Sequence, residues 1–155
     1  MKSNPALNYH RRVFLFNVLG FSLLMPVAGC GGDSLELVQV TGLVTFDGAP
    51  LVDAEIVFQP EDGRPSFSRT DENGRYELQY TDSKSGAVTG VHTVRISSYI
   101  EKDMDSENPM RQEGREEFLP ESYHSKSTLM ATLTPGKDAI IDFPLTTNGA
   151  PPSAK

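Results

Sequence analysis

From Glu36 onwards the chain consists of short runs rich in valine, isoleucine, threonine, phenylalanine and tyrosine, each bounded by glycine, proline, asparagine or aspartate. This spacing is typical of an all-β domain, and no run has helical periodicity. Alternation of apolar and polar residues predicts one buried face for each strand. The residues expected to face inward are Val38, Val40, Gly42, Val44, Phe46, Ala54, Ile56, Phe58, Val94, Ile96, Ile141, Phe143 and Leu145.

Two hairpins are expected, each made of two strands and a short turn. They are 67–70 with 75–80, and 128–133 with 139–145. In the first turn, Asp71–Gly74, both Asn73 and Gly74 can adopt the positive φ that a chain reversal needs. The acidic residues of this turn also raise the question of a calcium site. An EF-hand loop needs glutamate at its twelfth position, which counted from Asp71 is Asp82, so a plain turn is favoured.

The longest expected strand is 91–100, and it carries the first of two histidines in the domain. His92 and Arg95 fall on opposite faces of a regular strand, so they cannot form one site without a bulge. Each is expected to be a solvated position on the sheet.

Residues 101–127 have mixed charge and no strand pattern. A connection of this length inside a compact domain is either functional or mobile. Within it, 115–119 is expected to form one helical turn. Tyr123 and His124 are the candidate residues of an interaction loop.

The first 29 residues are expected to be a lipoprotein signal peptide. Basic residues precede an apolar stretch over 13–24, which is interrupted by polar residues and too short to span a membrane. The stretch is followed by Val27–Cys30, a lipobox with small residues before the cysteine. We expect cleavage between Gly29 and Cys30, which leaves Cys30 acylated as the first residue, with diacylglycerol on its sulfur and palmitate as the expected acyl group.

The export route and the membrane stay open. Arg11–Leu15 resembles a twin-arginine signal, although paired arginines are also common in general secretory signals. Gly31, and not the aspartate that marks inner-membrane retention in proteobacteria, follows the lipidated cysteine. The expected organisation is therefore a signal peptide (1–29), a lipidated tether (30–36), a β-sandwich (37–145) and a disordered tail (146–155), anchored outside the cytoplasm to the cell membrane or the outer membrane.

Composition limits both the stability and the partners of the mature chain. Cys30 is the only cysteine, so no disulfide can form within the chain, and a domain of about 120 residues can fold on its hydrophobic core alone. The first 29 residues hold three of the 14 basic side chains and none of the 21 acidic ones, which leaves 11 against 21 and a formal net charge of −10. Such a surface repels nucleic acid and anionic lipid headgroups.

Three pieces of the chain resemble, in order, the carboxypeptidase regulatory-like domains. They are the opening Val40–Phe58, the T-D-x-x-G-x-[FY] pattern in Thr70–Tyr76, and the P-G-x-Y-x-V-like segment Gly86–Val94. The resemblance covers about 38–145 and implies a seven-stranded transthyretin-like (prealbumin-like) sandwich. Together with Leu119–Tyr123 and the lipobox, it resembles the small exported lipoproteins of planctomycete bacteria. In the carboxypeptidases this domain is a non-catalytic accessory, so the fold alone does not define the function.

No constellation in the sequence predicts catalysis, a metal or a cofactor. Tyr123–Ser125 offers a hydroxyl and a histidine but no nucleophile elbow. His92 and His124, with 31 residues between them, lack zinc spacing. The expected function is thus a non-catalytic binding or structural module of the cell envelope that contacts envelope proteins or polysaccharide. The alternative is a small hydrolase or metal-dependent enzyme that uses His124 and loop carboxylates.

Overall fold

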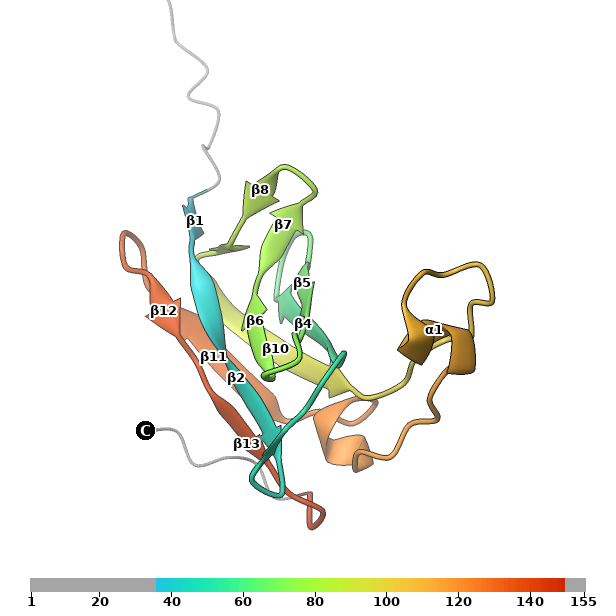
Figure 1. Cartoon of the computed structure of the whole chain (residues 1–155). Helices are drawn as coiled ribbons and strands as arrows, with labels where there is room; N and C mark the ends of the chain where they lie inside the picture. The colour runs from blue at the N-terminus through green and yellow to red at the C-terminus, as the bar shows by residue number, and fades with distance from the viewer. Residues whose placement is uncertain (1–35, 150–155) are drawn as a thin grey trace, which may run out of the picture. The chain divides into compact units, whose positions relative to one another are not determined.

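The computed structural model describes residues 36–149, and these form a mostly β sandwich (Figure 1). The strands are β1 (Leu37–Val38), β2 (Val40–Phe46), β3 (Ala49–Pro50), β4 (Glu55–Pro60), β5 (Ser66–Arg69), β6 (Arg75–Glu77), β7 (Gln79–Thr81), β8 (Lys84–Ser85), β9 (Ala87–Val88), β10 (Gly90–Ser97), β11 (Leu129–Leu133), β12 (Ala139–Ile140) and β13 (Phe143–Leu145). The helices are α1 (Pro109–Glu113) and the 3-10 helix η1 (Glu121–Tyr123). Neither helix has the length and hydropathy needed to cross a membrane, and residues 36–149 contain no other.

Two layers enclose the core. One is a six-stranded antiparallel sheet in the order β11-β10-β4-β5-β7-β8, in which β10 pairs with β4 on one side and β11 on the other. The other layer is built on β2, which pairs antiparallel with β3 and β6 and parallel with β12 and β13. A separate two-stranded sheet joins β1 to β9. The all-β prediction is therefore confirmed.

The inward faces agree with the alternation in the sequence. Of the residues expected inside, those that are buried are Val38, Val40, Val44, Ala54, Ile56, Phe58, Val94, Ile96, Phe143 and Leu145. The ring of Phe58 lies near the centre, with centroids 6.4 Å from Tyr76 and 6.1 Å from Phe143. Full burial of an apolar side chain of this size contributes about 1.5–3 kcal/mol, so these contacts supply a core without any disulfide.

Gly42 lies at the closest approach between β2 and the chain beside it. A Cβ added to Gly42 would be 1.9 Å from the carbonyl oxygen of Ile141 and 2.9 Å from the ring of Tyr76. The Tyr76 hydroxyl donates to that same Ile141 oxygen at 2.8 Å. Burial, aided by nearby Asp142, raises the pKa of Tyr76, so this hydroxyl stays protonated and remains a donor.

The first expected hairpin is wrong. The strands on either side of Asp71–Gly74 belong to different layers, because β5 pairs with β4 and β7 whereas β6 pairs with β2. The turn is held by the Asp71 carboxylate, which accepts from the amides of Asn73 and Arg75 at 2.8 Å. Of the two turn residues considered, only Gly74 has a positive φ. The expected strand 75–80 also divides at Leu78, where the chain passes back to the six-stranded sheet.

The second expected hairpin is wrong as well. β11 pairs with β10, while β12 and β13 lie parallel to β2 in the opposite layer. The connection over 134–138 is long enough to cross the roughly 10 Å between packed sheets. Two aspartates then bind β12 and β13 to β2, since Asp142 accepts from the Leu43 amide at 2.9 Å and Asp138 from the Gln39 amide at 3.4 Å.

His92 is not solvated as expected, because its side chain is fully buried. It shares the inward face of β10 with Val94 and Ile96, and its ring centroid is 5.8 Å from that of Phe58. Nε2 lies 2.8 Å from the carbonyl oxygen of Val88, and Nδ1 has no hydrogen-bond partner within residues 36–149. Arg95, on the other face, is exposed as predicted.

Helix and tail also differ from expectation. The helix lies at Pro109–Glu113 and not at 115–119, because Asn108 caps the Met110 amide at 2.9 Å and proline occupies the first helical position. Residues 146–149, expected to begin a disordered tail, are ordered. The Thr147 amide and hydroxyl both donate to Asp47, which lowers the pKa of that carboxyl.

Candidate functional site

The candidate site is the end of the sandwich at which β10 finishes, which we call the loop end. It is built from residues 97–124, with 47–53 and 145–149 packed beside them. The opposite end, which we call the β1 end, contains β1, β9 and the turns at 82–83 and 134–138. In Figure 1 the chain leaves β10 and continues directly into the loop that carries α1.

Backbone hydrogen bonds close the loop at its base. Ile100 and Arg115 form an isolated antiparallel bridge, with the Ile100 amide donating to Arg115 at 2.8 Å and the Arg115 amide donating back at 2.9 Å. Further out, the Asp103 amide donates to the Arg111 carbonyl at 2.7 Å. Residues 101–114 are therefore a closed loop with internal structure, not an extended connection.

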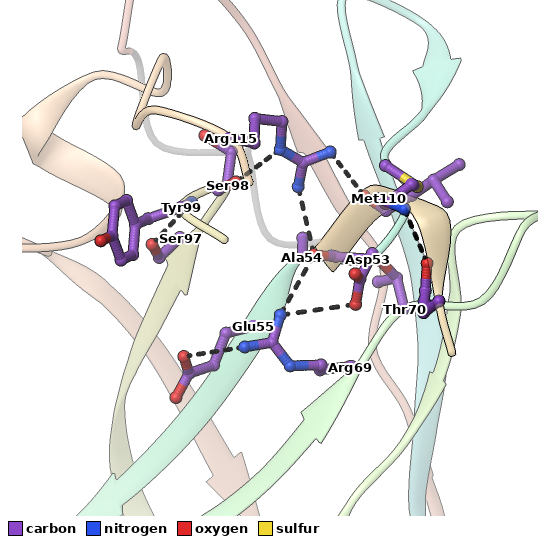
Figure 2. A network of polar contacts seen from close by, with 12 residues as sticks. Asp53, Ala54, Glu55, Arg69, Thr70, Ser97, Ser98, Tyr99, Met110 and Arg115 are labelled. Atoms are coloured by element: carbon purple, nitrogen blue, oxygen red, sulfur yellow. Dashed lines mark hydrogen bonds and ion pairs between the residues drawn. The ribbon is translucent and has the colours of Figure 1, made fainter. Parts of the chain in front are cut away.

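The guanidinium of Arg115 fixes this loop to the sandwich (Figure 2). Nε donates to the carbonyl of Ser98 at 2.6 Å, Nη1 to that of Val52 at 3.0 Å and Nη2 to that of Asp53 at 3.1 Å. Burial lowers the pKa of Arg115, and the charges of Asp53 and Glu117 oppose that shift. The fork geometry of arginine satisfies three carbonyls that a single ammonium could not reach together.

The carboxylate of Glu117 makes a second attachment. It accepts from the Ser97 hydroxyl at 2.6 Å, from the hydroxyl and amide of Ser98, and from the Leu119 amide at 2.9 Å. Burial raises the pKa of Glu117, but these hydrogen bonds outweigh it and bring the pKa to about 2. At neutral pH the carboxylate of Glu117 therefore stays ionised and acts only as a hydrogen-bond acceptor.

Asp53 and Arg69 continue the network toward β5. Asp53 has a positive φ of 49° and is 8% exposed. Arg69 Nη1 lies 3.3 Å from the Asp53 carbonyl oxygen and 3.4 Å from Oδ1, while Nη2 lies 3.7 Å from Glu55. Asp53 Oδ2 is buried without a hydrogen-bond partner in residues 36–149, so the two arginines nearby compensate its charge over longer distances.

Two surface hollows adjoin these residues. One, of about 380 Å³, lies under the loop and is lined by Arg69, Ile100, Glu101, Lys102, Asp103 and Arg111. The other, of about 790 Å³, is an open groove beside β2 and β6 that includes Arg75, Glu77 and Asp142. Both mix charges of the two signs. Within residues 36–149, no group of three or more histidine, cysteine, aspartate or glutamate side chains could hold a metal ion.

The candidate interaction residues Tyr123 and His124 lie at this end but in different surroundings. Tyr123 is fully buried, and its hydroxyl contacts the carbonyl of Thr146 at 3.2 Å and the amide at 3.1 Å, so its ring offers no surface to a partner. His124 is half-buried, with Nε2 3.1 Å from the Leu119 carbonyl. Of the loop carboxylates, Glu121 forms an ion pair with Lys126, which is the main cause of the lowered pKa of Glu121. The charge of His124 lowers the pKa of Glu121 to a smaller extent.

The sequence did not single out Arg115 and Glu117, the two residues that fix the loop. Their only signal is two opposite charges two positions apart, a spacing that turns both side chains toward one surface when the chain is extended. The expected helical turn over 115–119 hid this signal, because in a helix residues two positions apart do not share a face. Cys30 and the predicted cleavage site after Gly29 lie outside the described residues. Comparison of the chain with protein-family models, with curated proteins and with solved structures finds no match.

The low pKa of Glu117 predicts an acid-sensitive stability. Since its folded pKa, about 2, lies below the ordinary value of 4.5, its contribution is complete above pH 4.5 and is lost as the pH falls from 4.5 to 2. Allowing for solvent screening, the loss should be about 1–2 kcal/mol. Urea unfolding between pH 6 and 2 should show this loss in the wild type and a smaller one in Glu117→Gln. Glu116→Gln, at the exposed neighbouring position, should keep the wild-type pH profile; if Glu117→Gln does so too, Glu117 has no such role.

Proposed function

We propose that this protein is an extracytoplasmic lipoprotein, anchored to the cell membrane or the outer membrane through Cys30, whose β-sandwich is a non-catalytic binding module of the cell envelope. The observation that carries the binding role is the attachment of the loop end by Arg115 and Glu117. A loop whose base is fixed by seven or so hydrogen bonds from these two side chains presents a defined surface, and loops on rigid scaffolds are common binding sites.

A non-catalytic role is supported by how the polar groups of the loop end are used. Glu117 is held ionised by four donors, which suits a structural acceptor better than a general acid. His124 faces a backbone carbonyl, and Tyr123 belongs to the core. The side chains with the chemistry of a hydrolase are therefore occupied by contacts that hold the loop.

For the fold family we propose a carboxypeptidase regulatory-like domain of the transthyretin-like type. The three sequence pieces that carry this resemblance follow one another along the sandwich. Val40–Phe58 supplies β2, β3 and most of β4, Thr70–Tyr76 contains the turn between the layers, and Gly86–Val94 leads from β9 into β10. The proposal is supported by the order of these pieces along the chain and by their positions on strands and turns of one β-sandwich.

The anchor is tested by replacing Cys30 with serine. The variant should not incorporate radiolabelled palmitate and should keep its signal peptide, so that it migrates as the unprocessed chain. Ser34→Ala, a change in the tether that leaves the lipobox intact, is the matched control and should behave as wild type. If Cys30→Ser were processed at residue 29 and retained with the membrane to the same extent as wild type, the lipoprotein assignment would be wrong.

A further inference from the structure

We propose that the loop end binds a basic protein surface that also presents apolar side chains, and that acidic polysaccharides and anionic lipid headgroups are not its ligands. This inference rests on the proposed binding role and names the class of partner. It follows from the position, the apolar surface and the charge of the loop end.

The loop end lies far from the point at which the chain enters the sandwich. β1, the first described strand, pairs with Ala87–Val88, immediately before β10 begins, whereas the loop follows the last residue of β10. β10 has eight residues at about 3.3 Å each, so roughly 25 Å separate the two ends. A chain tethered by the residues just before β1 therefore presents the loop end on the side away from its tether. That side is the one free to meet another protein.

Exposed apolar residues gather at the same end. Four of the eight large apolar side chains exposed in residues 36–149 belong to it: Tyr99, Met104, Met110 and Phe118. Met104 is 70% exposed. Phe118 makes a T-shaped ring contact with Phe46, and the guanidinium of Arg115 lies over its ring, 5.5 Å from the centroid. Aromatic and methionine side chains are enriched in protein interfaces, which favours a protein partner.

The negative charge of the loop end favours a positively charged partner. Residues 97–123 contain eight acidic and three basic side chains, a formal net charge of −5. Arg115 and Glu117 are both engaged in holding the loop, so the excess of five negative charges lies among the remaining residues. Acidic polysaccharides and anionic headgroups would be repelled, whereas lysine and arginine side chains would be attracted.

Because Arg115 and Glu117 fix the loop before any partner arrives, little conformational entropy is lost on binding. The acidic and apolar residues are therefore presented together in one arrangement. A cationic surface without apolar groups would contact the acidic residues of the loop end but not its apolar residues. The affinity should fall as salt is added, because salt screens the charge contacts.

The test uses the mature lipoprotein in nanodiscs of neutral lipid and isothermal titration calorimetry at about 150 mM salt. The probes are an amphipathic peptide of lysine and leucine, the same peptide with glutamate for lysine, and polygalacturonate. We expect binding of the lysine peptide only. Glu101→Gln/Asp105→Asn/Glu107→Gln should weaken it at least about tenfold. The matched set Glu61→Gln/Asp62→Asn/Asp82→Asn, with the same change in net charge, should leave it within about twofold. Asp82 lies in a turn of the β1 end, and Glu61 and Asp62 directly follow Pro60, which pairs with His92 near the start of β10.

The apolar contribution is tested separately. Tyr99→Ser/Met104→Ser should also weaken the lysine peptide, whereas Met130→Ser/Ile140→Ser, which removes exposed apolar groups elsewhere, should not. Equal weakening by both charge sets, no effect of Tyr99→Ser/Met104→Ser, or binding of polygalacturonate would each overturn the inference. Failure of the inference and failure of the lipid anchor are distinguishable, because peptide binding is measured by calorimetry, whereas lipidation of Cys30 is measured by palmitate incorporation.

Discussion

Replacing Gly42 with alanine should destabilise the protein by more than about 3 kcal/mol, beyond the usual range for an overpacked core. The new Cβ would lie 1.9 Å from the Ile141 carbonyl oxygen, which is backbone and cannot rotate away as a side chain could. The same displacement would break the hydrogen bond from Tyr76 and push β2 away from its parallel partner β12. Chemical denaturation monitored by far-ultraviolet circular dichroism gives the change in unfolding free energy.

Thr45→Ala is the matched control, because it introduces alanine into the same strand at a half-exposed position. We expect it to cost less than about 1 kcal/mol, the span of strand propensities. A Gly42→Ala variant as stable as Thr45→Ala would show that β2 and the chain at Ile141 can separate without loss.

Replacing Arg115 with methionine should cost about 2–4 kcal/mol and release the loop. The change leaves the carbonyls of Ser98, Val52 and Asp53 without their donor, and it removes a cation beside the buried Asp53 carboxylate. Hydrogen exchange should accelerate most in residues 101–114, where the structure depends on the bridge between Ile100 and Arg115.

Two further variants separate the geometry of Arg115 from its charge. Arg115→Lys should recover only part of the stability, because an ammonium cannot reproduce the three directed bonds. Arg95→Met removes an arginine from the exposed face of β10 and should be nearly neutral. If Arg115→Met and Arg95→Met had equal effects on stability and exchange, Arg115 would not hold the loop.

The sequence predicted which strand faces are buried because alternation depends only on the local chain. It did not predict which strands pair. Arg75–Glu77 and Phe143–Leu145 have the same apolar alternation whether they join one layer or the other, so each was assigned to the neighbour nearest in sequence. The choice of layer is made by distant contacts, such as the Asp142 carboxylate on the Leu43 amide, and no local pattern records them.

The candidate site was predictable in position but not in detail. The long irregular segment after β10 drew attention to the region of this candidate site, yet the residues chosen within it were Tyr123 and His124. The structure gives the fixing role to Arg115 and Glu117, whose partners are backbone groups of Val52, Asp53, Ser98 and Leu119 and two serine hydroxyls. Since every residue has a backbone carbonyl and amide, nothing in the sequence identifies such partners.

The parallel pairing of β2 has a consequence for how this chain reaches its folded state. Val40 pairs with Ala139 and Val44 with Phe143, 99 positions later in the sequence. The layer that contains the earliest long strand thus cannot close until almost the whole domain has left the ribosome, and contacts so distant in sequence form slowly. A nascent chain in this condition therefore stays incompletely folded until its last strands, β12 and β13, have been synthesised.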